Sequence, residues 1–423
     1  MRNILPFLIL FFSTPSITQS GNTLSLDSCY AATLANNPLG RQFDLQERAT
    51  RLQLEQLDAA RLPTIMLNGK AQLQSENVRV PFEIPGQEPI ELPLFVAQLG
   101  LDAEYTIYDG GATAARRQLQ AAELRYSRQE TVTALARLKQ QVNDLFFAIL
   151  LQRSRIEVLQ ASLRSLESRR SAVAAAIARD AALPSDEAQL RAEILRLSGQ
   201  TDAARTSLAT ALAQLRQLTG LPIPDQVVLQ LPEVDSLPAP ERLQREELES
   251  FELLQQQILA QEALLTAGRR PRFSAFAQAG IGTPNPLNFF EEEPSPYALV
   301  GVRLAWKIFD WNQRSLQQQQ LSVQSQEVAV RRDLFEFELQ LRESALREKA
   351  GNLRRQLETD RELVALEESI LGQKALQLEQ GTATATDYIE QETRLIRARL
   401  QVDSHHLQLL RTLVDYETEK GLR

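Results

Sequence analysis

The chain has 423 residues, with 46 Lys and Arg against 54 Asp and Glu, so its formal net charge is −8. The few lysines form no basic cluster, and this acidic balance argues against nucleic acid as a partner. A single cysteine excludes an intramolecular disulfide framework.

The first twenty residues have the pattern of a secretory signal peptide. Arg2 precedes an apolar run from Ile4 to Phe12, and small and polar residues follow as far as Ser20. An uncleaved anchor needs about 20 apolar residues, and this run is much shorter. We expect a signal peptide over 1–20 and an exported chain without a membrane helix.

The first half of the exported chain, residues 21–222, is predicted to begin with a helix. Two strands are expected next, at about 64–75 and 95–108. Residues 112–183 contain neither glycine nor proline, which predicts one helix of roughly 100 Å at about 1.5 Å per residue. A second helix is expected over 185–219.

A segment rich in proline and acid, residues 223–240, predicts a linker to the second half, 241–423. The second half is expected to repeat the order of the first, with a helix, strands at about 272–282 and 297–309, a long helix over 312–380 and a helix over 386–420.

The two halves also echo each other in sequence. The stretch Y-T-I-Y-D at 105–109 recurs as W-K-I-F-D at 306–310, an offset of 201, and P-S-D at 184–186 meets A-T-D at 385–387 at the same offset. We therefore expect a tandem internal repeat. Both long helices carry apolar residues at spacings of three and four, such as Leu135, Leu138 and Val142, which is typical of a coiled coil.

The predicted strands alternate apolar and polar residues. From Ala97 to Ile107 every odd residue is apolar, while the even residues are Gln, Gly, Asp, Glu and Thr. A soluble, half-buried strand shows the same alternation, but four such stretches in an exported chain favour strands that cross an outer membrane. Aromatic residues end the second strand of each pair, where they are expected at the membrane interface: Tyr105, Tyr108, Trp306 and Phe309.

Four strands are too few to close a barrel. Lipid offers no hydrogen bonds, and single-chain barrels begin at about eight strands. The wall must then be shared between copies of the chain, with eight strands in a dimer or twelve in a trimer.

Several motifs together resemble the TolC family of outer membrane efflux proteins. They are L-S-L-D at 24–27 with Ala32, N-N-P at 36–38, A-A-R-L-P at 59–63, Y-D-G-G at 108–111 and the turns at Asp186 and Asp387. The resemblance implies an α+β membrane protein, in which long helical hairpins form a periplasmic α-barrel and a homotrimer shares a 12-stranded β-barrel in the outer membrane. It also implies a passive duct for efflux or type I secretion that docks a periplasmic adaptor and an inner membrane pump.

The resemblance further points to the two helix turns. Asp387 and Glu390 match carboxylates that line the periplasmic aperture, where three copies would place six carboxylates and favour cations. The alternative is a helix start, with Thr386 as cap and both acids in the first turn. Asp186 matches a carboxylate that latches the closed mouth, but its partner positions read Ala383 and Leu378, so no such latch is expected.

The tip turns are expected to contact the adaptor through Ala182, Leu183, Gly381 and Thr382. In the first tip, Asp180 stands where the family usually has glycine.

The remaining reactive side chains are expected to be structural. Cys29 follows polar residues and is expected to be a helix-surface cysteine rather than a lipid attachment site. The only histidines, His405 and His406, are adjacent and are expected to be surface residues. With no nucleophile motif, phosphate loop or metal-spaced cluster, we expect no enzyme activity and no cofactor.

Two other functions remain open from the sequence. A periplasmic adaptor or structural coiled coil would have the long helices but no membrane strands. A general diffusion porin is disfavoured, because porins devote little sequence to helix.

Overall fold

A computed structural model describes residues 23–76, 93–180, 182–234, 245–288, 291 and 293–422. The expected signal peptide, most of the first strand-connecting loop and the last part of the linker, 235–240, lie outside these residues. The chain divides into two compact units. Unit 1 comprises residues 1–37, 135–244 and 339–423, and unit 2 comprises 38–134 and 245–338. Each unit thus draws on both halves of the sequence.

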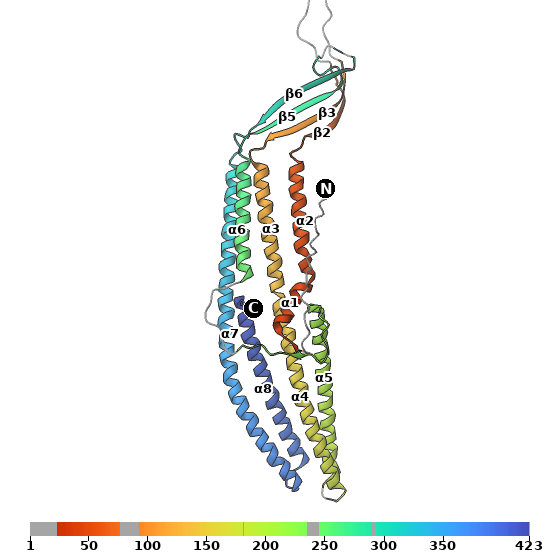
Figure 1. The fold of residues 1–423 in the computed structure, drawn as a ribbon, viewed down its shortest axis with the longest axis vertical. Helices are drawn as coiled ribbons and strands as arrows, with labels where there is room; N and C mark the ends of the chain where they lie inside the picture. The colour runs from red at the N-terminus through yellow and green to blue at the C-terminus, as the bar shows by residue number, and fades with distance from the viewer. Residues whose placement is uncertain are drawn as a thin grey trace, which may run out of the picture. The chain divides into compact units, whose positions relative to one another are not determined.

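Unit 2 contains one antiparallel sheet. Its strands are β2 (Thr64–Leu73), β3 (Phe95–Tyr108), β5 (Arg272–Thr283) and β6 (Ser295–Ala305), side by side in the order β2-β3-β5-β6 (Figure 1). The register aligns apolar positions across all four strands, as in the row Leu67, Leu101, Ala279 and Ala298. Because side chains alternate along each strand, these rows form a single apolar face.

This apolar face lies open in the single chain. Leu67 is 68% exposed, Leu101 52% and Val300 84%. An exposed apolar patch of this extent marks a contact with a membrane or another protein.

The helices of unit 2 are α2 (Arg41–Ala59), most of α3 (Ala112–Ala136), α6 (Glu246–Ala267) and the first part of α7 (Gln313–Glu379), with the short 3₁₀ helix η1 (Pro38–Gly40) before α2. Asp109 caps α3, since its carboxylate accepts from the backbone N–H groups of Gly111 at 2.9 Å and Thr113 at 2.6 Å.

Unit 1 contains α1 (Leu26–Asn36), α4 (Leu138–Ile177), α5 (Pro184–Thr219), α8 (Ala385–Lys420) and the second part of α7, with a two-residue ladder between β1 (Thr23–Leu24) and β4 (Val228–Leu229). Its largest core is built around Phe146 and Ile149 of α4, which are fully buried with Leu215 of α5 and Leu26 of α1. The apolar run 145–151 therefore serves contacts with α1 and α5.

A second core follows α4 farther along the chain. Leu159 and Leu166 of α4 are fully buried with Leu190 of α5 and Tyr388 of α8. This core joins the α4–α5 hairpin to the α7–α8 hairpin, and both hairpin turns lie at the same end of unit 1 (Figure 1).

Left-handed backbone conformations occur at matching positions of the two halves. Gly110 and Gly111 have positive φ, as do Trp311 and Asn312, which follow 201 residues later. Gly220 and Gly421, which end α5 and α8, are separated by the same 201 residues (421 minus 220).

Two predicted element boundaries are wrong. The helix expected over 112–183 is interrupted at Arg137, whose φ of −63° and ψ of −23° remain helical, and it ends at Ile177. The strand expected over 297–309 ends at Ala305. Ala305 pairs with Arg272, where β5 begins, so the residues that follow have no neighbouring strand.

Candidate mouth and membrane face

The α7–α8 turn is closed by a reciprocal cap. The hydroxyl of Thr384 accepts from the backbone N–H of Asp387 at 3.2 Å, and the Asp387 carboxylate accepts from the Thr384 N–H at 2.9 Å and hydroxyl at 2.8 Å. The expectation that Thr386 caps this helix is therefore wrong. Thr386 instead donates to Gln189 of α5 at 2.8 Å.

The acids predicted at the aperture differ in their surroundings. Asp387 and Glu390 are both exposed near the start of α8. The backbone N–H and the hydroxyl of Thr384 hold the pKa of Asp387 below its ordinary value. Asp186 is half-buried and accepts from the backbone N–H of Leu183 at 3.3 Å, so it caps the start of α5.

The two tips meet through both apolar and polar contacts. Ala182 and Leu378 pack on the cluster that contains Tyr388, and polar contacts join Thr386 to Gln189 and Arg169 to Glu379. The remaining tip residues named from the sequence, Leu183, Gly381 and Thr382, are exposed. They are accessible to a partner in the single chain.

One tip residue that the sequence analysis did not single out is Glu392 of α8. It is only 3% exposed, four residues after Tyr388 and four before Ile396, two apolar members of the same face. A charged residue in phase with an apolar stripe was a signal available in the sequence.

The predicted interface aromatics gather where the strands of unit 2 end. Tyr108 lies 6.3 Å from Phe273, measured between ring centroids. Trp306 donates its indole N–H to the carbonyl of Arg269 at 3.1 Å, and Phe309 meets Trp311 edge to face at 4.7 Å. Tyr105 is 45% exposed on the apolar face. Trp311, which we did not predict, follows β6 at the position that corresponds to Gly110.

The opposite face of the sheet carries charge. The Arg303 guanidinium lies 5.2 Å from the centroid of the Phe276 ring and 3.8 Å from the Glu104 carboxylate. The Phe276 ring covers Gly301, where an added Cβ would lie 2.7 Å from the ring edge. Asp102 accepts a hydrogen bond from Asn68 nearby. The sheet thus has one apolar face and one polar face.

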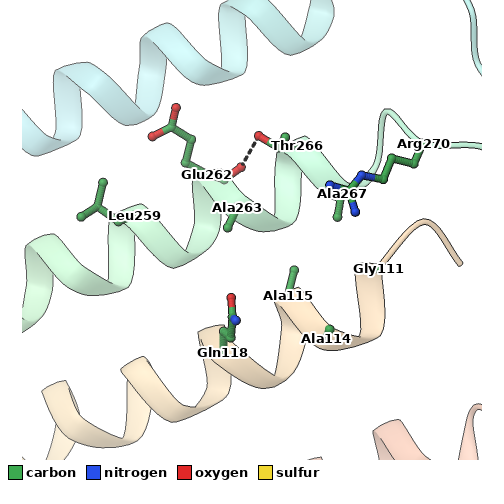
Figure 2. A pocket seen from close by; sticks show the side chains of 10 residues that line it. All are labelled: Gly111, Ala114, Ala115, Gln118, Leu259, Glu262, Ala263, Thr266, Ala267 and Arg270. Atoms are coloured by element: carbon green, nitrogen blue, oxygen red, sulfur yellow. Dashed lines mark hydrogen bonds between the residues drawn. The ribbon is translucent and has the colours of Figure 1, made fainter.

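A cavity of about 520 Å³ opens between α3 and α6 (Figure 2). Small side chains line it, including Ala115, Ala263 and Ala267, and Arg270 stands at the end where α6 leads into β5.

Two expectations about reactive side chains are wrong. Cys29 is fully buried rather than on the surface, because the face of α1 that carries Leu26 and Tyr30 packs into the core of unit 1. Burial raises the pKa of its thiol to about 12. His405 is not a free surface residue, since its Nδ1 lies 2.5 Å from the carboxylate of Asp360.

Neither a metal cluster nor a membrane helix is found in the described part of the chain. His, Cys, Asp and Glu side chains there form no group of three that could hold a metal ion. None of the helices described combines the length and the apolar composition of a membrane-spanning segment.

Comparison with known proteins finds one matching family and several similar structures. Residues 29–221 match the family described as outer membrane efflux protein, whereas no curated protein sequence matches the chain. Solved structures show the same fold at low identity. CusC is 14% identical with a TM-score of 0.70, over 93% of this chain and 91% of that one.

Two further channels are similarly related. The CmeC outer membrane channel of Campylobacter jejuni is 15% identical with a TM-score of 0.65, over 94% of this chain and 85% of its own. The MtrE outer membrane channel of Neisseria gonorrhoeae, solved in its open state, is 18% identical with a TM-score of 0.66, over 94% and 88%. Residues 29–221 thus match the outer membrane efflux protein family in sequence, and nearly the whole chain has the fold of these solved outer membrane channels.

Proposed function

We propose that this protein is a passive outer membrane channel, through which an inner membrane pump and a periplasmic adaptor export their substrate. The observation that carries the proposal is the two-faced sheet. Its apolar face suits lipid, and its opposite face, with Arg303, Glu104 and Asp102, suits a water-filled lumen. The alternative from the sequence, a periplasmic coiled-coil adaptor, would not need a sheet with an exposed apolar face.

Three copies would share the barrel. In the described part of the chain, β2 and β6 each pair with a strand on one side only. Lipid does not tolerate an open edge, so β6 of one copy is assigned to β2 of the next. Three chains of four strands give twelve, and the two halves of each chain are proposed to be tandem repeats that supply two strands each.

The helices support the same assembly. α7 exposes an apolar stripe in which Val330, Leu334 and Phe337 are each more than half exposed, and α2 exposes Leu45 and Leu52 seven residues apart. Stripes with this spacing pack in coiled coils. We assign α7 of one copy to α2 of its neighbour, next to the proposed contact between strands.

The tip residues would form the periplasmic mouth. We assign Asp387 and Glu390, with Asp186 beside them, to the rim of the aperture, where six exposed carboxylates from α8 would favour cations. Leu183, Gly381, Thr382 and Ala182 are assigned to contact with the adaptor. Tyr105, Tyr108, Trp306 and Phe309 are assigned to the membrane interface.

The experiment that tests the channel is conductance after reconstitution. The exported chain, purified in detergent and added to a planar lipid bilayer, should produce discrete steps of ion current. A matched variant, Val300→Asp, places a charge on the most exposed position of the apolar face and should insert poorly. A bilayer that stays silent with well-folded protein would contradict the proposal.

A further inference from the structure

Glu392 is buried in the contact between the two hairpins of unit 1. It is 3% exposed, and its Oε2 has no hydrogen-bond partner among the described residues. Ser162 of α4 is 2% exposed, and its hydroxyl also lacks a partner in the described part of the chain. Buried polar atoms are nearly always satisfied, and the groups near enough to serve this carboxyl are the hydroxyls of Ser162, Ser165 and Tyr388.

The surroundings of Glu392 do not suit a charge. Leu159 and Leu166 of α4 flank Ser162 by three and four residues, and both are fully buried against α8. Ionising a buried carboxyl in such a seam carries a large desolvation penalty, which the nearby hydroxyls and Arg399 offset only in part, whereas a protonated carboxyl can also donate to a hydroxyl.

The groups that face this contact are few. α4 brings the hydroxyls of Ser162 and Ser165 and the guanidinium of Arg169, which stacks on Tyr388 at 5.0 Å and pairs with Glu379 at 2.9 Å. From α8 itself come Tyr388 and Arg399.

The other two helices packed against α8 are α7 and α5. Arg399 pairs with Glu368 of α7 at 2.7 Å, and Glu367 of α7 accepts from Gln391. α5 reaches α8 through Gln189, which does not titrate. Burial raises the pKa of Glu392 above its ordinary value, and the nearby hydroxyls and Arg399 offset only part of that rise.

We propose that Glu392 is a proton-dependent lock, which holds the α7–α8 hairpin on the α4–α5 hairpin when protonated and loosens that contact when ionised. The inference rests on the proposed function, in which these hairpins surround the channel mouth. The sign follows from the raised pKa. Stability that depends on the protonated form is present at acidic pH and is lost as pH rises through the pKa of the folded state.

The test measures the separation of the hairpins directly. Spin labels at Gln189→Cys and Thr386→Cys, in the full chain with Cys29→Ala, report the distance between α5 and α8. As the pH rises from about 5 to about 8, we expect the distance distribution to shift to longer values and broaden. Glu392→Gln, which mimics the protonated form, should stay narrow and short at every pH.

Two controls separate Glu392 from other titrating groups. Glu390→Gln removes an exposed carboxylate two residues away, and His405→Asn removes the imidazole that contacts Asp360 between α7 and α8. Both should shift with pH as the parent does. A distance that is independent of pH in the parent, or that moves equally in Glu392→Gln, overturns the proposal.

The spin-label measurement does not depend on ion conduction. A hairpin contact that loosens with pH in a protein that forms no channel would leave the lock standing and refute the proposed function. A channel whose hairpin distance ignores pH would refute the lock alone.

Discussion

Asp180 and Gly381 lie 201 residues apart (381 minus 180), and both adopt the left-handed backbone conformation, with φ of 60° and 70°. Each follows the helix that leads into a tip turn, α4 or α7. Glycine takes this conformation without strain, and aspartate is among the few other residues that tolerate it. The aspartate in the first tip therefore preserves the turn that glycine forms in the second.

The first prediction concerns this conformation. An added Cβ at Gly381 meets nothing within 4 Å, so Gly381→Ala should destabilise the turn through φ alone, by about 1 to 2 kcal/mol. Gly372→Ala is the matched control, because Gly372 has equal space inside α7 and should stabilise the helix by about 1 kcal/mol. Hydrogen exchange of the tip amides measures both effects. Equal effects of the two variants would contradict the role of φ.

The second prediction concerns the cap of α8. Thr384→Ala removes the hydroxyl that accepts from the Asp387 N–H and should destabilise the first turn by about 1 kcal/mol. Amides at the start of α8 should exchange about fivefold faster. Thr386→Ala, two residues on, should leave those rates nearly unchanged, since Thr386 contacts α5 and does not cap α8.

The third prediction concerns acid. The pKa of Asp387 is lowered by its bonds to Thr384, so the cap is intact above the ordinary carboxyl range and is lost as pH falls through the lowered pKa. Protection of the first turn of α8, corrected for intrinsic exchange rates, should therefore decline at strongly acidic pH. Asp387→Asn should lack this decline, and a decline of the same size in that variant would assign it to another group.

The fourth prediction concerns ion selectivity. If Asp387 and Glu390 line the aperture, replacing them by Asn and Gln should shift the reversal potential in a salt gradient towards that of a non-selective pore. Asp202→Asn removes an exposed carboxylate of α5 and serves as control. A selectivity that the double variant leaves unaltered would place the aperture elsewhere.

Local periodicity predicted much of the fold, and long-range contacts account for what it missed. Alternation from Ala97 to Ile107 identified which side chains share a face, because the side-chain period of a strand is a local property. The end of β6 depends on where its partner strand β5 begins, at Arg272. The residues after Ala305 give no local signal that the strand ends there. The break at Arg137 likewise could not be predicted, because no glycine or proline lies near it in the sequence.

For the candidate sites too, local sequence features were predictable and long-range contacts were not. The motifs located both tip turns, but the burial of Cys29 and the contact of His405 with Asp360 arise from helices distant in sequence. The alternative reading took Thr386 as the cap, whereas the structure has Thr384 in that role, although both threonines satisfy the capping preference. The burial of Glu392 could have been predicted from the sequence, since it lies four residues from both Tyr388 and Ile396 and so shares their helix face.

Disulfide cross-linking tests most directly whether neighbouring copies complete the sheet. In one chain β2 and β6 are separated by β3 and β5, so their backbones lie about 14 Å apart, beyond the 7 Å limit for a disulfide. Cysteines introduced in pairs along β2, from Ile65 to Ala71, and β6, from Ala298 to Leu304, should therefore link only different chains. We predict covalent dimers and a closed trimer on a denaturing gel, with nothing larger. A chain that remains monomeric for every pair, or that forms an open ladder of higher oligomers, would contradict the account.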